Sequence, residues 1–283
     1  MVTLDQCGWL GPKARVVPPP PLLRDLVEHA SVMDMRSVES ASWLVVPDRS
    51  AHLLVHIVED RSGACRSRAS IVGPRAVGVT FPVRRRLWTV GVRFASGALV
   101  ALGGPPGEEV LDRSVTLGDV WGRVGEAASS RIEAVLDPDV ALDRAWDFLS
   151  RLATDVRRPG WLSAAFERAL IRSASERGSG PSVRGISDAL GVPPRTLRRA
   201  IVRETGLTPM RHVRIHRLYD AAYQLRDGAC TVGRVASRSG YSDQAHLARD
   251  FVDLIGESPT LFRDRGRKSE TCKAIGGGGA HLP

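Results

Sequence analysis

The chain has 283 residues, of which 43% are hydrophobic and 25% charged, a composition typical of a soluble globular protein with two domains. No apolar run approaches the ~20 residues that a membrane-spanning helix needs, and the N-terminus lacks a secretory signal, so a cytoplasmic location without a membrane is expected. The net charge is +9, and residues 183–267 hold +6 of it, with 15 Arg against 9 Asp plus Glu. This concentration of positive charge favours nucleic acid as a partner.

The first 40 residues are predicted to form an N-terminal arm that is partly flexible. Residues 1–21 end in a run of prolines and show no periodic pattern, which is typical of a linker. Residues 22–35 are expected to hold one short helix.

Residues 41–115 are predicted to be a β-rich domain that binds an effector or mediates dimerisation. Short runs rich in β-branched and aromatic residues are separated by turn residues, and this spacing indicates a small barrel or sandwich. The predicted strands are residues 43–46, 51–58, 69–72, 77–81 and 87–94. The triplet Arg84-Arg85-Arg86 falls between two of them and is interpreted as a solvated turn.

Two histidines and four cysteines raise the question of a metal site. His52 and His56 are expected to point to the same side of one strand, because side chains alternate along a strand. Glu59 has the opposite parity, and a metal needs three or four converging ligands. The cysteines, which are Cys7, Cys65, Cys230 and Cys272, share no short spacing. Neither a metal nor another cofactor is therefore predicted.

From residue 116 the apolar residues recur with helical spacing. Helices are predicted over residues 116–135, 140–156 and 162–176, each with an apolar face. We interpret residues 116–160 as a helical connector whose apolar stripes face a core, although the first two helices could also pair with a second subunit. Residues 268–283, with Gly276 to Gly279, are expected to be a disordered tail.

The same pattern occurs twice within residues 183–263. Leu197 and Leu247, Ile201 and Phe251, Gly206 and Gly256, and Pro209 and Pro259 are each 50 positions apart, and the glycines Gly191 and Gly240 are 49 apart. In each copy a short helix meets a glycine that allows a turn, and a second helix follows with a buried i, i+4 pair. Pro194 is expected in the opening turn of the first such helix, and Ser242 is expected to cap the second. Each copy is therefore predicted to be a helix-turn-helix.

The outer face of each second helix carries side chains that can read bases. Arg can form a fork to guanine, Gln can pair with adenine, and Ala or the methyl of Thr can touch thymine. A solvated helix face is the alternative for one copy, and two copies in register argue against it. The predicted base contacts are Arg195, Thr196, Arg198, Arg199, Gln244, Ala245 and His246, and the predicted phosphate contacts are Arg203, Arg214, Arg217, Arg238 and Arg249.

Residues 161–267 resemble the DNA-binding domain of AraC/XylS-type transcription regulators. The resemblance rests on Ile186-Ser-Asp-Ala-Leu-Gly191 with Gly206-Leu-Thr-Pro209, and on Gly240-Tyr-Ser-Asp-Gln-Ala-His-Leu247 with Gly256-Glu-Ser-Pro259. It implies seven helices, with residues 210–225 linking the two units and Arg217 in the family's usual arginine position. It also implies a cupin-like effector domain before them. Pro193, Ile201, Tyr241 and Leu247 depart from the residues that are usual in the family.

The expected fold is therefore α+β and multidomain, with a small β-rich domain followed by an all-α domain. The predicted function is sequence-specific regulation of transcription, by two recognition helices that read adjacent major-groove segments of double-stranded DNA. RNA polymerase, a small-molecule effector and a second copy of the chain are left open as partners. Two alternatives are kept: a fusion to an enzyme that transfers alkyl groups from DNA through Cys65, and an architectural binder without sequence preference.

Overall fold

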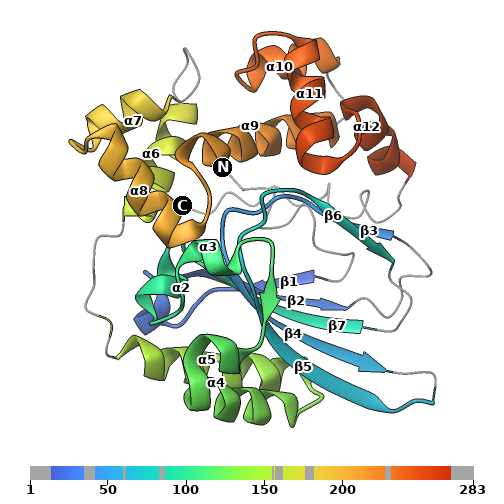
Figure 1. Cartoon of the computed structure of the whole chain (residues 1–283). Helices are drawn as coiled ribbons and strands as arrows, with labels where there is room; N and C mark the ends of the chain where they lie inside the picture. Colours follow the sequence, from blue (N-terminus) through green and yellow to red (C-terminus); the bar gives the residue numbers. More distant parts are fainter. Residues whose placement is uncertain are drawn as a thin grey trace.

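The computed structural model describes residues 14–34, 42–59, 62–82, 87–154, 156, 162–175, 182–226 and 231–268. These residues form a β-rich half followed by a helical half, as the sequence predicts (Figure 1). None of the described helices is both long enough and apolar enough to cross a membrane.

The β-rich half is built on a six-stranded antiparallel sheet with the order β1-β2-β7-β4-β5-β8. Two further strands, β3 and β6, form a separate antiparallel ribbon. The bounds are Ala14–Val17 (β1), Val27–Asp34 (β2), Ser42–Val45 (β3), His52–Glu59 (β4), Cys65–Val72 (β5), Val79–Pro82 (β6), Leu87–Phe94 (β7) and Ser114–Val115 (β8).

The two faces of the sheet have different roles. Leu53, Val55 and Ile57 alternate along β4 and are buried in one core cluster. Two helices cover this face, α4 (Leu117–Glu133) and α5 (Pro138–Ala153), and contribute their own apolar stripes to the cluster. The 116–160 segment therefore packs against the sheet along its described helices, which fits the predicted core-facing stripes.

Local sequence sets the beginnings of these two helices. Thr116 and Asp119 form a capping box, in which each side chain accepts from the other residue's backbone N–H. Asp137 caps α5, and Pro138 follows at a position where a missing N–H costs nothing. Three short helical turns complete this half, η1 (Pro21–Leu23), α2 (Ala98–Ala101) and α3 (Gly107–Val110).

The predicted helix at residues 22–35 is wrong. Most of that stretch forms β2, which lies between β1 and β7 and is buried on both faces except at the exposed Glu28 and the half-buried Met33. A strand buried on both faces shows no clean alternation, so its apolar run resembles that of a buried helix. The sheet thus takes in part of the predicted N-terminal arm, while residues 1–13 and 35–40 and the triplet Arg84 to Arg86 lie outside the described residues.

The helical half contains seven described helices, as the family resemblance implies. They are α6 (Leu162–Ser175), α7 (Val183–Ala189), α8 (Pro194–Thr205), α9 (Pro209–Arg226), α10 (Val232–Arg238), α11 (Gln244–Ile255) and α12 (Pro259–Lys268). One core cluster joins α6, α7 and α8, and another joins α10, α11 and α12. The long helix α9 contributes Val213 to the first cluster and Leu218 to the second, so it links the two units (Figure 1). The chain beyond Lys268, where the tail was predicted, is not described.

Candidate nucleic-acid interface and interior cavity

The first helix-turn-helix consists of α7 and α8. Ser182 caps α7 by accepting from the backbone N–H of Gly185, and Gly191 makes the turn with a φ of 63°. Pro194 occupies the first position of α8, as predicted. Leu197 and Ile201 are fully buried, which confirms the predicted i, i+4 pair.

The second helix-turn-helix, α10 and α11, repeats this construction with one correction. Gly240 makes the turn with a φ of 74°. The cap of α11 is Asp243, whose side chain accepts from the backbone N–H of His246 at 2.7 Å. The prediction that Ser242 is the cap is wrong, because Asp243 is the extended residue before the helix and Ser242 instead donates to its carboxylate.

Both second helices end in the same way. Gly206 and Gly256 adopt left-handed conformations, with φ of 74° and 84°, and close α8 and α11. This conformation suits glycine because other residues meet a steric penalty there. The 50-residue repeat of the sequence is therefore also a repeat of the fold.

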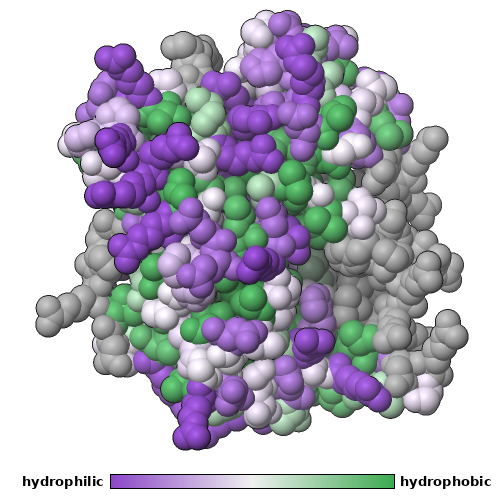
Figure 2. Space-filling view, in the orientation of Figure 1, coloured by the Kyte–Doolittle hydropathy of each residue, from purple (hydrophilic) through white to green (hydrophobic). Residues whose placement is uncertain are grey.

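The predicted base-reading residues lie on the outer faces of these helices. Helix α8 exposes Arg195, Thr196, Arg198 and Arg199. Helix α11 exposes Gln244 and Ala245, while His246 is half-buried. The ring of His246 is edge-on to that of Tyr241, with 5.1 Å between the ring centres. Figure 2 shows hydrophilic residues gathered over the region of α7 and α8.

The predicted phosphate contacts fall into two groups. Arg203, Arg238 and Arg249 are exposed on the helical half. Arg214 instead lies between two carboxylates, 2.7 Å from Asp250 and 3.0 Å from Asp253. Arg217 is half-buried. Burial raises the pKa of Tyr241, and the positive charge of Arg217 lowers that pKa in part.

The β-rich half contacts both units at the C-terminal ends of the helices α8 and α11. A Cβ on Gly107 would lie 2.4 Å from the backbone N of Gly206, so α3 and the end of α8 touch backbone to backbone. Gly78 donates its N–H to the carbonyl of Leu254 near the end of α11, at 2.6 Å. The N-terminal ends, which carry the base-reading candidates, are left exposed.

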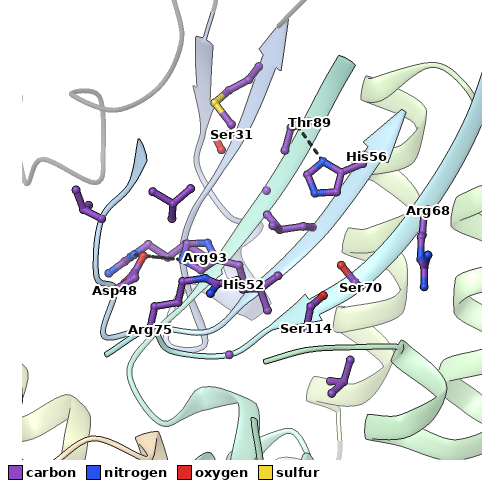
Figure 3. Close-up of a pocket in the computed structure, with 18 of the residues that line it drawn as sticks. Ser31, Asp48, His52, His56, Arg68, Ser70, Arg75, Thr89, Arg93 and Ser114 are labelled. Atoms are coloured by element: carbon purple, nitrogen blue, oxygen red, sulfur yellow. Dashed lines mark hydrogen bonds and ion pairs between the residues drawn. The ribbon is translucent and has the colours of Figure 1, made fainter. Parts of the chain in front are cut away.

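A cavity of about 730 Å³ lies on the other face of the sheet (Figure 3). The strand register places its floor in rows, with Gly91 beside Leu54 and Ser31 in the middle row. His52 and His56 both line it, which confirms that they share one side of β4. Further lining residues come from the ribbon and from α9, and include Leu44, Val45, Val46 and Tyr219.

One end of the cavity holds a charged network. Arg93, almost fully buried, donates to Glu28 at 2.7 Å and to Asp48, and His52 donates to Asp48 at 2.7 Å. Burial alone would raise the pKa of Asp48, but the charges of Arg93 and His52 and the hydrogen bonds it accepts hold it well below its usual range. Asp48 therefore carries a negative charge at neutral pH.

At the other end of the cavity, the imidazole of His56 is uncharged at neutral pH. Its Nδ1 is hydrogen-bonded to the hydroxyl of Thr89 at 3.1 Å, and burial lowers the pKa of its imidazole (Figure 3). Among the described residues, no three His, Cys, Asp or Glu side chains lie together in a way that could hold a metal ion.

Sequence reasoning missed Asp48, Arg93 and Tyr219 as cavity residues. A usable signal was present in β7, where Arg93 stands between Val92 and Phe94 within an apolar strand. An arginine at such a position indicates a buried polar partner. Its partners Glu28 and Asp48 lie 65 and 45 positions away, so the sequence alone does not identify them.

Comparisons with known proteins match each half separately. The family described as a helix-turn-helix domain matches residues 186–265, and a domain of unknown function, DUF6597, matches residues 15–116. The HTH-type transcriptional activator RhaS of Pectobacterium atrosepticum is 30% identical over 79 residues, and RhaS of Escherichia coli (strain K12 / DH10B) is 36% identical over 78. Each match covers 28% of this chain, and the chain spans 28% of the length of these curated relatives.

Solved structures are also similar to this chain. ToxT from Vibrio cholerae aligns with 80% of this chain and 97% of its own, with 6% identity and a TM-score of 0.43. The C-terminal domain of AraT, a response regulator from Geobacillus stearothermophilus, aligns with 40% of this chain and 92% of its own, with 24% identity and a TM-score of 0.35.

The fold and the exposed faces define a helix-turn-helix protein with a β-rich domain in front of two paired units. The helical half is similar to AraC/XylS-type domains: residues 186–265 match the helix-turn-helix domain family, and the relatives that match there are named as transcriptional activators.

Proposed function

We propose that this protein is a sequence-specific DNA-binding transcription regulator in which α8 and α11 read adjacent major-groove segments. The observation that carries the proposal is the exposure of the N-terminal ends of both helices, while their C-terminal ends contact the β-rich half. In helix-turn-helix proteins the N-terminal residues of the recognition helix reach the base edges, and units that read successive turns lie ~34 Å apart.

The exposed residues divide by the chemistry of their contacts. Arg195, Arg198 and Arg199 can donate forks to guanine, and Gln244 can pair with adenine, while Thr196, Ala245 and His246 complete the two faces. Arg203, Arg238 and Arg249 extend the positive surface and suit phosphates. Arg214 and Arg217 remain in the proposed phosphate set, and Arg214 would have to exchange its contacts with Asp250 and Asp253 for a phosphate.

Selection of bound fragments from random duplex DNA tests the proposal. The full chain should enrich one motif in two segments about one helical turn apart, and the arrangement of the motif also reports whether one or two copies bind. Enrichment of no motif, with equal affinity for every duplex at fixed salt, would favour the architectural alternative instead.

We further propose that the β-rich domain senses a small molecule in the cavity. The volume of about 730 Å³ lies within the ~300–1,000 Å³ range of ligand pockets. Its walls combine apolar side chains, such as Leu44 and Leu54, with a few converging polar groups, such as Thr89 and Ser70. The same proposal includes dimerisation through this domain and contact with RNA polymerase. The arrangement of the selected DNA motif tests dimerisation, because it reports whether one or two copies of the chain bind.

Enzymatic activity is not part of the proposed function. The relatives of the helical half are named as transcriptional activators. Cys65, the candidate for alkyl transfer, is exposed at the start of β5 and does not line the cavity. Transfer of an alkyl group from methylated DNA that is lost in Cys65→Ala would restore the enzymatic reading.

A further inference from the structure

The segment from Val46 to Ser50 touches the cavity on one side. On the other side it contacts α6, which packs against the first helix-turn-helix unit, and it enters the core of the second unit. We propose that this segment, which we call the coupling segment, sets the relative position of the two units and transmits occupancy of the cavity to DNA binding. This inference rests on the proposed function and names the route by which the cavity would regulate it.

At the cavity end, Asp48 anchors the segment. Its Oδ2 accepts from His52 at 2.7 Å and from Arg93, and its Oδ1 accepts from the backbone N–H of Ser50 at 3.0 Å. The backbone of Asp48 also pairs in both directions with Arg75 after β5. The segment is therefore held to the sheet by side chains that line the cavity (Figure 3).

At the helical end, neighbouring residues of the same segment are held by α6 and α9. The carbonyl of Pro47 accepts from the hydroxyl of Tyr219 on α9. Arg49 is 2% exposed and lies 3.0 Å from Glu167 on α6, with its guanidinium 5.9 Å from the centre of the Tyr219 ring. Buried charged contacts of this kind tolerate little displacement, because a misplaced charge loses its compensation.

These contacts reach both units. Glu167 belongs to α6, which packs in the core of the first unit beside Phe166. Val46 is itself buried in the core cluster of the second unit, beside Leu218 and Phe251. Five consecutive residues thus join the cavity, the first unit, the linker helix and the second unit.

The physical consequence concerns preorganisation. A protein that must place two recognition helices on one DNA face binds more tightly when their separation is already fixed, because less freedom is lost on binding. Asp48 and Tyr219 both line the cavity, so a molecule bound there lies against the residue that anchors the coupling segment to the sheet and against the α9 side chain that holds Pro47. Loosening the segment should weaken binding to a two-segment site and relax the required spacing.

Two hydrogen bonds of similar length, one at the cavity and one away from it, provide a matched test. His52→Phe keeps a planar ring and removes the contact to Asp48. Ser130→Ala removes the contact to the carbonyl of Glu126 at 3.0 Å within α4, at a residue that does not line the cavity. With the full chain and the DNA site obtained by random selection, we expect His52→Phe to weaken binding by about 3- to 10-fold, the range of one lost hydrogen bond. Ser130→Ala should change it less than about 2-fold.

A second variant separates coupling from stability. Tyr219→Phe keeps the ring and removes the hydrogen bond to Pro47, so it should produce the same loss. In the Tyr219→Phe background, His52→Phe should add less than about 2-fold, because both changes break one route. Both variants should also bind more evenly to sites whose segments are moved by one base pair, a readout that lower stability alone would not shift.

Several results would overturn the inference. They are equal effects of His52→Phe and Ser130→Ala, fully additive effects of His52→Phe and Tyr219→Phe, or tighter binding after either His52→Phe or Tyr219→Phe, which would make the contact inhibitory. Failure of the proposed function looks different, since the unaltered protein would then select no DNA site at all.

Discussion

The ion pair between Arg49 and Glu167 joins the two halves of the protein, and its removal gives the largest stability effect that we expect. The side chains are 2% and 8% exposed, and their charged atoms lie 3.0 Å apart. Glu167→Gln keeps the shape of the side chain but withdraws the carboxylate from a buried guanidinium. Loss of one partner from a buried pair costs about 3–5 kcal/mol. Against a typical unfolding free energy of ~5–15 kcal/mol, this is a large fraction.

Chemical denaturation followed by circular dichroism measures the effect. The matched control is Asp139→Asn, which removes the ion pair with Arg15 on the surface, where the side chains are 65% and 54% exposed. Pairs of that kind contribute about 0–1 kcal/mol, so the control should change little. A double change of Arg49→Met with Glu167→Leu should recover most of the loss, since apolar residues can replace a buried pair.

Equal destabilisation by Glu167→Gln and Asp139→Asn would refute this reasoning. It would mean that Arg49 and Glu167 are solvated in the folded protein, and the buried contact between the coupling segment and α6 would then be absent.

Three further predictions use other parts of the molecule. Arg198→Ala or Gln244→Ala should cost about 1–3 kcal/mol on the selected DNA site and relax one base position, whereas equal losses on scrambled DNA would show contact with the backbone only. Gly206→Ala and Gly256→Ala both place a side chain at positive φ, but only the first Cβ meets another backbone, 2.7 Å from a carbonyl oxygen of α3. Gly206→Ala should therefore lower the denaturation midpoint more than Gly256→Ala, and equal shifts would deny the contact between the halves. Burial raises the pKa of Asp220 to about 6, although the charge of the arginine in the coupling segment acts in the opposite direction. The stability that Asp220 contributes is therefore present below pH ~4 and is lost as the pH rises through 6. Asp220→Asn should remove this loss, so that its stability relative to the unaltered protein rises by about 1 kcal/mol between pH 4 and pH 7.5, a value discounted because 37% of the side chain is exposed. Parallel curves of stability against pH for the two proteins would contradict this prediction.

The helix-turn-helix pair could be predicted from the sequence because its determinants are local. A glycine that permits a turn, a proline or acid at a helix start, and apolar residues at i and i+4 all act within about 20 residues, and Gly191, Pro194 and Leu197 have the structural roles expected of them. The sequence places the cap of α11 one residue too early, since Ser242 and Asp243 can both accept a backbone N–H and only the backbone conformation chooses between them.

Turn residues decide how much of the sheet the sequence predicts. It predicts β4, whose β-rich run is bounded by turn residues, but it predicts a helix where β2 lies, because β2 carries buried side chains on both faces. The choice belongs to the neighbouring strands β1 and β7, which supply hydrogen bonds from distant parts of the chain.

The amino-acid sequence by itself determined the two helix-turn-helix units, their outward arginines and glutamine, and the concentration of positive charge around them. Only the tertiary structure decided that a cavity exists, that Arg93 joins Glu28 and Asp48 within it, and that Tyr219 connects it to the helical half. Those contacts join residues 45 to 172 positions apart. Burial, which makes them strong, appears only when the chain is folded.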